Sequence, residues 1–399
     1  MSILEDAKAM HEELVVLRRS LHQEPELGLR LPRTQEKVLS ALQGLPLEIT
    51  LGENLSSVTA VLRGERPGGA VLLRGDMDAL PVQETSGVDY TSQVAGQMHA
   101  CGHDLHTAGL VGAARLLCEQ RSRLHGDVVF MFQPGEEGYN GAGLMIEEGV
   151  LDAAGKPLDA AYAIHVAANR LPHGVLASRP GTVSTASDVL RVTVHGRGGH
   201  GSAPFSALDP IPAACEMITA IQNWVTRTFD VLDPVVVSVG SLHAGTQHNV
   251  IPDTATFEAT VRSYSEPNRE RLATGLPRLA RGIAAAHGLE AEADYQLLYP
   301  VTVNDAEETD FALDTAREIM GAEQVWLAPQ PTSGSEDFSF VLQRVSGAML
   351  LLGAVPAGSD HMSAPMNHSP RAVFDDVVLS RQSAVLAQLA VDRLARTAA

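Results

Sequence analysis

Side chains that bind metal ions or carry protons follow several short apolar runs of this chain. They are Asp76 and Asp78, Cys101 and His103, Glu136 and Glu137, His165, His361 and His368. A mixture of cysteine, histidine and carboxylate ligands suits zinc, manganese, cobalt or nickel better than magnesium or calcium, which prefer shells made of oxygen. The scatter therefore points to a metal-dependent hydrolase.

Cys101 and His103 lie two residues apart in the segment HACGHDLHTAG, residues 99–109, which leads into a helix. In an extended segment, residues i and i+2 point the same way, so both side chains could face one ion. A buried cysteine beside a capping histidine is the ordinary alternative for this pattern on its own. We expect His106, in the same segment, to support a ligand rather than to bind metal.

Glu136 and Glu137 stand side by side in FQPGEEG, residues 132–138, after an apolar run. Two carboxylates there are costly to bury unless they meet cations, although a solvated turn is the simpler alternative. Successive side chains point apart, so one glutamate can bind metal while the other takes a proton from a metal-bound water. In RGDMDALP, residues 74–81, Asp78 could orient a ligating imidazole or merely cap a turn.

His165 ends the apolar run AAYAIH, and His368 lies in NHSP with His361 a few residues earlier. Each of these, taken alone, is more often a core or loop histidine. Taken together, a cysteine, several histidines and a glutamate pair at the ends of strands favour a metal site.

The elements that must position these residues alternate between strand and helix. Runs 70–73, 128–132, 160–164 and 348–352 are apolar on both faces, as in a sheet covered on both sides, and helical patterns span 107–119 and 373–396. The sequence therefore predicts an α/β domain with a mixed, largely parallel sheet covered by helices. Ligands bind at the carboxyl ends of strands in such sheets, which is where the candidate residues fall.

A different pattern begins near residue 186. Strands at 190–194, 235–242, 254–262 and 291–297, with helices at 211–225 and 265–283, give the order β-α-β-β-α-β. This order predicts an inserted, ferredoxin-like α+β domain with a four-stranded antiparallel sheet and two helices. We place it at residues 186–297, as a lid or dimerisation domain that interrupts the metal-binding domain of residues 1–185 and 298–399.

Two groups of residues in the inserted domain could serve a site. His200 lies in the Gly-rich segment GRGGHGSAP, residues 196–204, and could reach a developing charge, although a simple hairpin turn is the alternative. Asn249 and Arg262 could form a clamp for a carboxylate, because a guanidinium matches a carboxylate with two hydrogen bonds. An exposed strand arginine without such a role is the alternative.

Composition limits the classes of partner. The net charge of −19, from 29 Lys and Arg against 48 Asp and Glu, argues against nucleic acid. No apolar run is long enough to span a bilayer, and the first twenty residues resemble an amphipathic helix rather than a signal peptide. Three cysteines in 399 residues do not make a disulfide framework, so we expect a cytoplasmic protein without membrane partners.

The chain resembles the M20 family of metallopeptidases and amidohydrolases, in particular its N-acyl-amino-acid branch of aminoacylases, hippurate hydrolases and auxin-conjugate hydrolases. The resemblance runs nearly from end to end and rests on the segments LHQEPELG, RGDMDALP, MHACGHDLHTA, FQPGEEG, GGHGSAP, DP (209–210), NVIPD, GSEDFSF and NHSP. Phe205 departs from the pattern, where members often carry histidine, and Gln247 and His248 fall in a variable loop. These departures bear on substrate choice and leave the metal ligands untouched.

The resemblance implies two divalent transition-metal ions, zinc or manganese before cobalt or nickel. The implied ligands are Cys101, His103, Glu137, His165 and His368. Glu136 is the implied general base, Asp78 the orienting carboxylate, and His200 a residue that crosses a dimer interface to the partner's site. Asn249 and Arg262 are implied in the pocket for the substrate carboxylate.

The function we expect is hydrolysis of the amide bond of an N-acyl amino acid to a carboxylic acid and a free amino acid. A dipeptidase, or a deacylase of an amino-acid-derived metabolite, would use the same chemistry on another substrate. A non-catalytic, metal-stabilised binding protein is the remote alternative. The expected assembly is a homodimer, or a dimer of dimers, formed through the inserted domain.

Overall fold

The computed structural model describes residues 2–397, which divide into two compact units. Unit 2 comprises Ser184–Thr302 and Pro331–Glu336, and the remaining described residues form unit 1. The short segment Pro331–Glu336 belongs to unit 2 although no pattern in the sequence indicated it. No helix of the described residues is long and apolar enough to cross a membrane.

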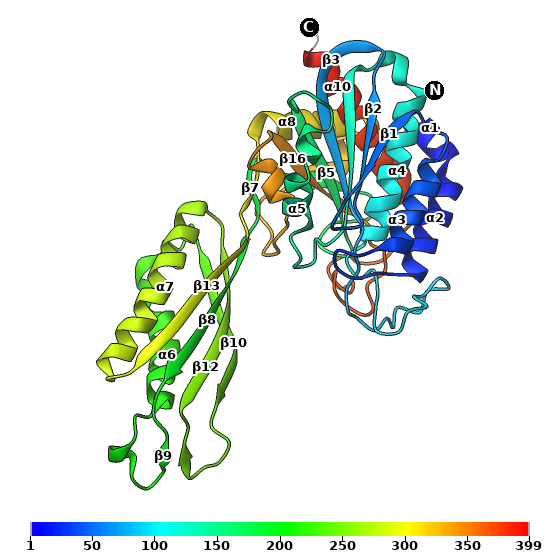
Figure 1. Ribbon diagram of the computed structural model, residues 1–399. Coiled ribbons are helices and arrows are strands. Elements are labelled where there is room, and N and C mark those ends of the chain that lie inside the picture. Colours follow the sequence, from blue (N-terminus) through cyan, green and yellow to red (C-terminus); the bar gives the residue numbers. More distant parts are fainter. Residues whose placement is uncertain (1, 398–399) are drawn as a thin grey trace. The chain divides into compact units, whose positions relative to one another are not determined.

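Unit 1 is built on an eight-stranded sheet (Figure 1). Its strands, in spatial order, are β1 (Leu47–Leu51), β2 (Val58–Arg63), β4 (His125–Gln133), β3 (Arg66–Asp76), β5 (Ala160–Ala167), β16 (Gly347–Gly353), β6 (Leu176–Ser178) and β15 (Val325–Leu327). The central strands β4, β3, β5 and β16 are parallel. β2 runs antiparallel to both β1 and β4, and β6 runs antiparallel to β16 but parallel to β15. The prediction of a mixed, largely parallel sheet is confirmed.

Alternate residues of the central strands enter two separate cores, one on each face of the sheet. In β3, Val71 and Leu73 pack into one core, while Ala70 and Leu72 pack into the other. The strands bury both faces, which is why their sequence is apolar without alternation.

Helices cover both faces of this sheet. The first core holds α1 (Ile3–Ala9), α2 (His11–Gln23), α3 (Pro32–Leu42), α4 (His103–Glu119), α8 (Ala306–Met320) and α10 (Val378–Thr397), and the second holds α5 (Gly141–Glu147) and α9 (Ser339–Leu342). The structure also contains β7 (Gly181–Ser184) paired with β14 (Thr302–Asn304), and the 3-10 helices η1 (Arg121–Arg123), η2 (Val150–Asp152), η3 (Pro204–Ser206) and η4 (Ala322–Gln324).

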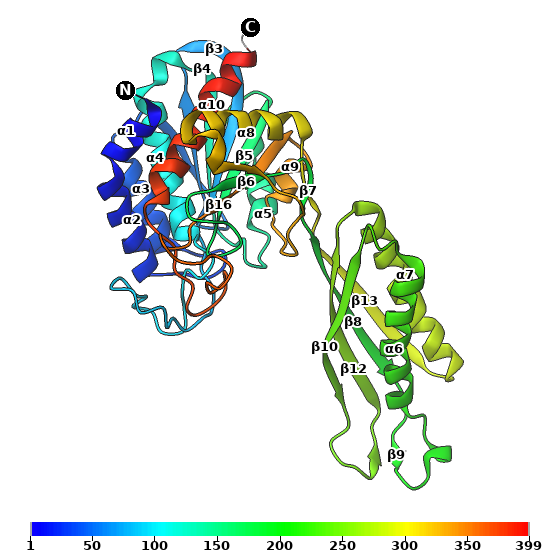
Figure 2. The same cartoon turned by 180° about the vertical axis from the view of Figure 1, so that it is seen from behind.

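Unit 2 has an antiparallel sheet with two helices on one face (Figure 2). Its strands, in spatial order, are β10 (Val235–Ala244), β12 (Thr254–Ser263), β8 (Ala186–His195) and β13 (Glu290–Tyr299), and its helices are α6 (Pro210–Thr228) and α7 (Glu266–Ala286). The order along the chain is β-α-β-β-α-β, as predicted. Two short strands that the sequence analysis did not include, β9 (Gly199–His200) and β11 (Val250–Ile251), pair beyond one end of β8 and β12.

Candidate metal centre

The candidate ligands of unit 1 come from the carboxyl ends of neighbouring parallel strands. Asp78 lies two residues beyond β3, Glu136 and Glu137 follow β4, and His165 lies near the end of β5. Since β4, β3 and β5 are adjacent and parallel, these side chains meet at one edge of the sheet. Cys101 and His103 reach the same edge at the start of α4, and His368 reaches it from the segment after β16.

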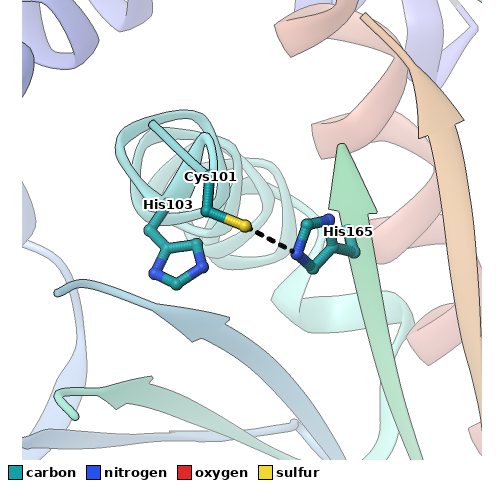
Figure 3. A group of neighbouring side chains, drawn as sticks. All are labelled: Cys101, His103 and His165. Atoms are coloured by element: carbon teal, nitrogen blue, oxygen red, sulfur yellow. Dashed lines mark hydrogen bonds between the residues drawn. The ribbon is translucent and has the colours of Figure 1, made fainter. Parts of the chain in front are cut away.

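Three overlapping groups of ligand atoms lie within 4.8 Å of one another. They are Cys101, His103 and His165; Cys101, Glu137 and His368; and His103, Glu136 and Glu137. The first group is drawn in Figure 3, where Cys101 Sγ lies 3.5 Å from His165 Nε2. We call these six residues the metal cluster. Cys101, His103 and Glu137 each belong to two of these groups.

A left-handed glycine sets the relation between Cys101 and His103. Gly102 has φ +85° and is the N-cap of α4. It lies between Cys101, which is in the preceding loop, and His103, which is the first residue of the helix. A Cβ at this position would lie 2.4 Å from Val166 Cγ2, so the site requires glycine. Our assumption of an extended segment was wrong, although both side chains do face the same place.

His103 presents one ring nitrogen to the cluster. Its Nδ1 donates to the backbone oxygen of Asp78 at 2.8 Å, which leaves Nε2 as the acceptor. This Nε2 is buried and makes no hydrogen bond among residues 2–397, although it lies 3.5 Å from Asp76 Oδ2. A buried, unsatisfied acceptor beside a thiol and two carboxylates fits a metal ion, which accepts the lone pair that no protein donor takes.

The carboxylate of Asp78 acts on the glutamate pair. Its Oδ1 and Oδ2 accept the backbone N–H groups of Glu136 and Glu137, each at 3.0 Å. His103 Nδ1 is 3.4 Å from Oδ1, farther than from the backbone oxygen of the same residue. Asp78 therefore orients the imidazole mainly through its main chain, and its side chain anchors the turn that carries both glutamates.

His106 has both ring nitrogens engaged. Its Nδ1 donates to Asp76 Oδ1 at 2.5 Å, and its Nε2 accepts the N–H of Val166 at 2.8 Å. Asp76 also receives Arg74 Nη1 on its other oxygen at 2.6 Å. Burial alone would raise the pKa of Asp76, but Arg74, His103 and His106 together hold it well below its usual range. Asp76 and His106 therefore lie next to the metal cluster and hydrogen-bond to each other, and His106 also bonds to the backbone beside His165.

His368 approaches the cluster from a strained backbone. It has φ +71°, and its N–H donates to the backbone oxygen of Ala100 at 2.8 Å. Its Nε2 lies 3.2 Å from Glu137 Oε1. A hydrogen bond with Cys101, followed by one with Glu137, raises the pKa of His368 to about 10.

The thiol of Cys101 is the other strongly perturbed group. Burial alone would raise its pKa, but the charge of His165 and contacts with the neighbouring imidazoles hold the pKa well below the ordinary value. The thiolate is the form that binds metal. His361, by contrast, belongs to none of the ligand groups formed by the described residues.

In unit 2, His200 and Asn249 lie together, far from Arg262. His200 pairs with Val250, and the N–H of Gly201 donates to the backbone oxygen of Asn249 at 2.8 Å. Arg262 lies eight residues beyond Thr254 along β12, a rise of roughly 26 Å. Asn249 lies on the other side of Thr254, so Asn249 and Arg262 do not lie together within one chain, and their joint role in a carboxylate clamp stays a prediction.

Two residues near the cluster were missed by the sequence analysis. Arg74, the only charged residue within an apolar stretch of β3, donates to Asp76, to Gln133 Oε1 at 2.8 Å and to Asp337 Oδ1 at 3.1 Å. Asn367 precedes His368 and bonds to two other segments of the cluster, at Cys101 and at Val166 and Ala168. In the sequence, Arg74 could have been found as a charged residue within an apolar strand. Asn367 could have been found as a polar residue directly before the candidate ligand His368.

One thiolate, three imidazoles and adjacent carboxylates define a candidate centre for divalent transition metals, as found in metallohydrolases. The family model described as "Peptidase family M20/M25/M40" matches residues 72–392, and the chain belongs to this family. The predicted enzyme class, a hydrolase of amide bonds, is confirmed with it.

Relatives of this chain carry more than one activity in their names. "Thermostable carboxypeptidase 2" of Saccharolobus solfataricus is 36% identical over 97% of this chain and 96% of its own length. "N-acetylcysteine deacetylase" of Bacillus subtilis is 35% identical over 96% and 97%. A crystal structure from Bacillus subtilis, described as a dinuclear metal-binding peptidase of the M20 family, matches with a TM-score of 0.83 at 32% identity, covering 98% of this chain and 99% of that one.

Proposed function

We propose that this chain hydrolyses the amide bond of N-acyl amino acids, releasing a carboxylic acid and a free amino acid. The observation that carries the proposal is the metal cluster, in which the five expected ligands form overlapping groups and the carboxylate of Glu136 lies with His103 and Glu137. The similarity to an N-acetylcysteine deacetylase, whose named substrate is an N-acyl amino acid, supports the same substrate class.

The proposed cofactors are two divalent transition-metal ions, zinc or manganese before cobalt or nickel. Cys101, His103, His165, Glu137 and His368 would hold them, and the unsatisfied Nε2 of His103 supports this arrangement. When bound, the ions would polarise the amide carbonyl and make a water molecule more acidic.

Glu136 is the proposed general base. It is 6% exposed, Asp78 accepts its backbone N–H, and its carboxylate lies in one group with His103 and Glu137. In the proposed mechanism this carboxylate takes a proton from the attacking water and returns it to the leaving amine. Its neighbour Glu137 shares a group of ligand atoms with Glu136 and His103, and also lies with Cys101 and His368, a group that Glu136 does not join.

Arg262 is the proposed partner of the substrate carboxylate. It is half-buried, donates to the hydroxyl of Ser187, and has its pKa lowered by burial, against the opposing charge of Asp188. A partly buried guanidinium is stabilised by an anion. The carboxylate of an amino acid is an anion whose two oxygens match the two N–H groups of the guanidinium.

His200 and Asn249 are proposed to serve the site of a second copy, in a homodimer or dimer of dimers formed through unit 2. Both are exposed and lie at the end of the sheet opposite to Arg262. The test mixes two inactive variants, His200→Ala and Arg262→Ala. We expect partial recovery of activity in the mixture, because one site of the mixed dimer is intact; no recovery would contradict the exchange of residues.

Carboxypeptidase or dipeptidase activity is the second candidate, favoured by the similarity to a carboxypeptidase. Such an activity would need the same cluster and the same recognition of a terminal carboxylate. A panel of acetyl, benzoyl and long-chain acyl amino acids, tested beside dipeptides and longer peptides, separates the two. Cleavage of peptides alone would overturn the proposal.

The same purified protein should be assayed for bound metal by mass spectrometry. We expect two ions per chain; none, together with hydrolysis by the metal-free protein, would overturn the proposed cofactors. The proposed location is the cytoplasm, in keeping with three cysteines that are all free.

A further inference from the structure

Asn367 joins three segments that carry proposed ligands. Its Oδ1 accepts the N–H of Ala168 at 2.8 Å, three residues beyond His165. Its Nδ2 donates to the backbone oxygens of Val166 at 3.0 Å and Cys101 at 3.3 Å. His368 is the next residue in the chain, so one amide fixes the positions of three ligands relative to each other.

The same amide reaches the sulfur that the two ligand groups share. Asn367 Nδ2 lies 3.6 Å from Cys101 Sγ, within the range of an N–H···S hydrogen bond. An amide nitrogen has two hydrogens, and three acceptors lie around this one. The hydrogen directed at Cys101 therefore divides between its carbonyl oxygen and its sulfur.

His165 is held in the same way. Its Nδ1 donates to the backbone oxygen of Val166 at 2.8 Å, the oxygen that also accepts from Asn367. This arrangement turns Nε2 toward Cys101 Sγ. Residues that fix the orientation of a ligand from outside commonly change metal affinity by about 10- to 100-fold when they are removed.

From these contacts we infer that Asn367 is a positioning residue of the metal centre: it sets the spacing of Cys101, His165 and His368, and its N–H withdraws electron density from the Cys101 thiolate. The inference rests on the proposed metal centre. It assigns to Asn367 an electronic effect on the metal–sulfur bond in addition to a structural one.

The chain contains a matched control. Asn304 is buried and makes a similar set of bonds away from the cluster, with Oδ1 accepting the N–H of Met349 and Nδ2 donating to the oxygens of Ser178, Arg179 and Met349. Replacing Asn304 removes a comparable network from the same sheet without touching a ligand.

The test uses the protein loaded with Co²⁺, because a thiolate bound to Co²⁺ gives a sulfur-to-metal charge-transfer band in the near ultraviolet. Without the N–H donor the sulfur lone pair rises in energy, so Asn367→Ala should move the band to longer wavelength. The variant should also bind Co²⁺ about tenfold more weakly in competition with a chromogenic chelator. Asn304→Ala should leave both the band and the affinity unchanged while lowering the melting temperature.

Asn367→Asp provides a second variant, since it keeps the oxygen for Ala168 but loses every N–H donor. We expect its band to shift in the same direction. A band at the wild-type wavelength in either variant, with a full complement of cobalt, would overturn the inference and leave the proposed centre standing. A wild-type protein that binds cobalt without any such band would overturn both, because Cys101 would then not be a ligand.

Discussion

The first turn of α4 separates two buried polar regions. They differ in how far the chain's own side chains satisfy their acceptors. On one side lies the metal cluster. On the other lies Asp104, whose Oδ2 forms an ion pair with Arg18 Nε at 2.8 Å and a hydrogen bond with His22 Nδ1 at 2.7 Å. We call the second region the Asp104 cluster; it consists of Arg18, His22, Glu84, Asp104 and Asp376.

The Asp104 cluster supplies its own counter-charges. Arg18 also meets Asp376 at 3.1 Å, and His22 Nε2 meets Glu84 at 3.2 Å. The metal cluster instead brings the thiol of Cys101 against Glu137, whose pKa is raised by burial and then by the charge of Cys101. Both regions are buried and polar, so the mark of a cofactor site is an excess of acceptors that the chain itself does not satisfy.

Loss of Glu136, the proposed general base, should have the largest effect on activity. We expect Glu136→Gln to lower kcat by about 10²- to 10⁴-fold, the usual contribution of a general base, while the protein keeps its metal. Glu137→Ala should lose metal as well as activity. Steady-state rates and metal content by mass spectrometry distinguish the two, and full activity in Glu136→Gln would show that Glu136 is not the base.

Breaking the Asp104 cluster should cost stability without a direct effect on metal content. Arg18→Ala leaves Asp104 and part of Asp376 without their guanidinium, and removing one partner of a buried ion pair costs about 3–5 kcal/mol. Urea denaturation of the metal-loaded and metal-free forms measures this. A loss that appeared only with metal bound would show that the two clusters are not independent.

Metal removal should also lower stability, through the metal cluster. The metal-loaded protein should be more stable than the chelated protein by about 2.7 kcal/mol when free metal is at 100 times its Kd. The same comparison on Cys101→Ala should show a much smaller difference, because the shared sulfur is gone. Equal stabilisation of both proteins would place the stabilising ion elsewhere.

The smallest effect concerns pH and the Asp104 cluster. Burial and the charge of Arg18 lower the pKa of His22. The charge of Asp104 and the hydrogen bonds to Asp104 and Glu84 raise it by more, so the pKa lies above the ordinary value of 6.5. A raised pKa in the folded state means that the stabilisation is complete below about pH 6.5 and is lost as the pH rises through the folded value.

His22→Gln should remove this dependence. The difference in unfolding free energy between wild type and variant should therefore shrink as the pH rises above 6.5. Urea midpoints measured at several pH values give that difference, and a gap that widens with pH would contradict a charged His22.

The sequence predicted which residues approach the cluster because a simple rule operates there: the carboxyl ends of adjacent parallel strands share an edge. The rule placed Glu136, Glu137 and His165 together without any knowledge of the turns between them. It did not extend to Gly102, which combines a left-handed backbone with a close approach to the side chain of Val166 from another element.

Contacts between distant segments account for the remaining differences. The bonds of Asn367 join residues about 200 and 266 positions away in the chain, and nothing local encodes them. The final helix was predicted from residue 373, but α10 begins at Val378. The preceding residues are held elsewhere, since the N–H of Asp375 bonds to Ala354 and the carboxylate of Asp376 to Arg18 and Arg19.

The left-handed backbone of His368 has a practical consequence. A side chain in this conformation costs about 1–2 kcal/mol that glycine does not incur, so His368→Gly should keep the loop while removing the imidazole. The His368 side chain is 55% exposed, so the space that its imidazole leaves in the variant is accessible from solvent. Free imidazole added to the solution should then fill that gap and restore part of the activity, in proportion to its concentration, whereas His368→Ala should respond less. Such chemical rescue would make hydrolysis by this protein controllable by a small molecule.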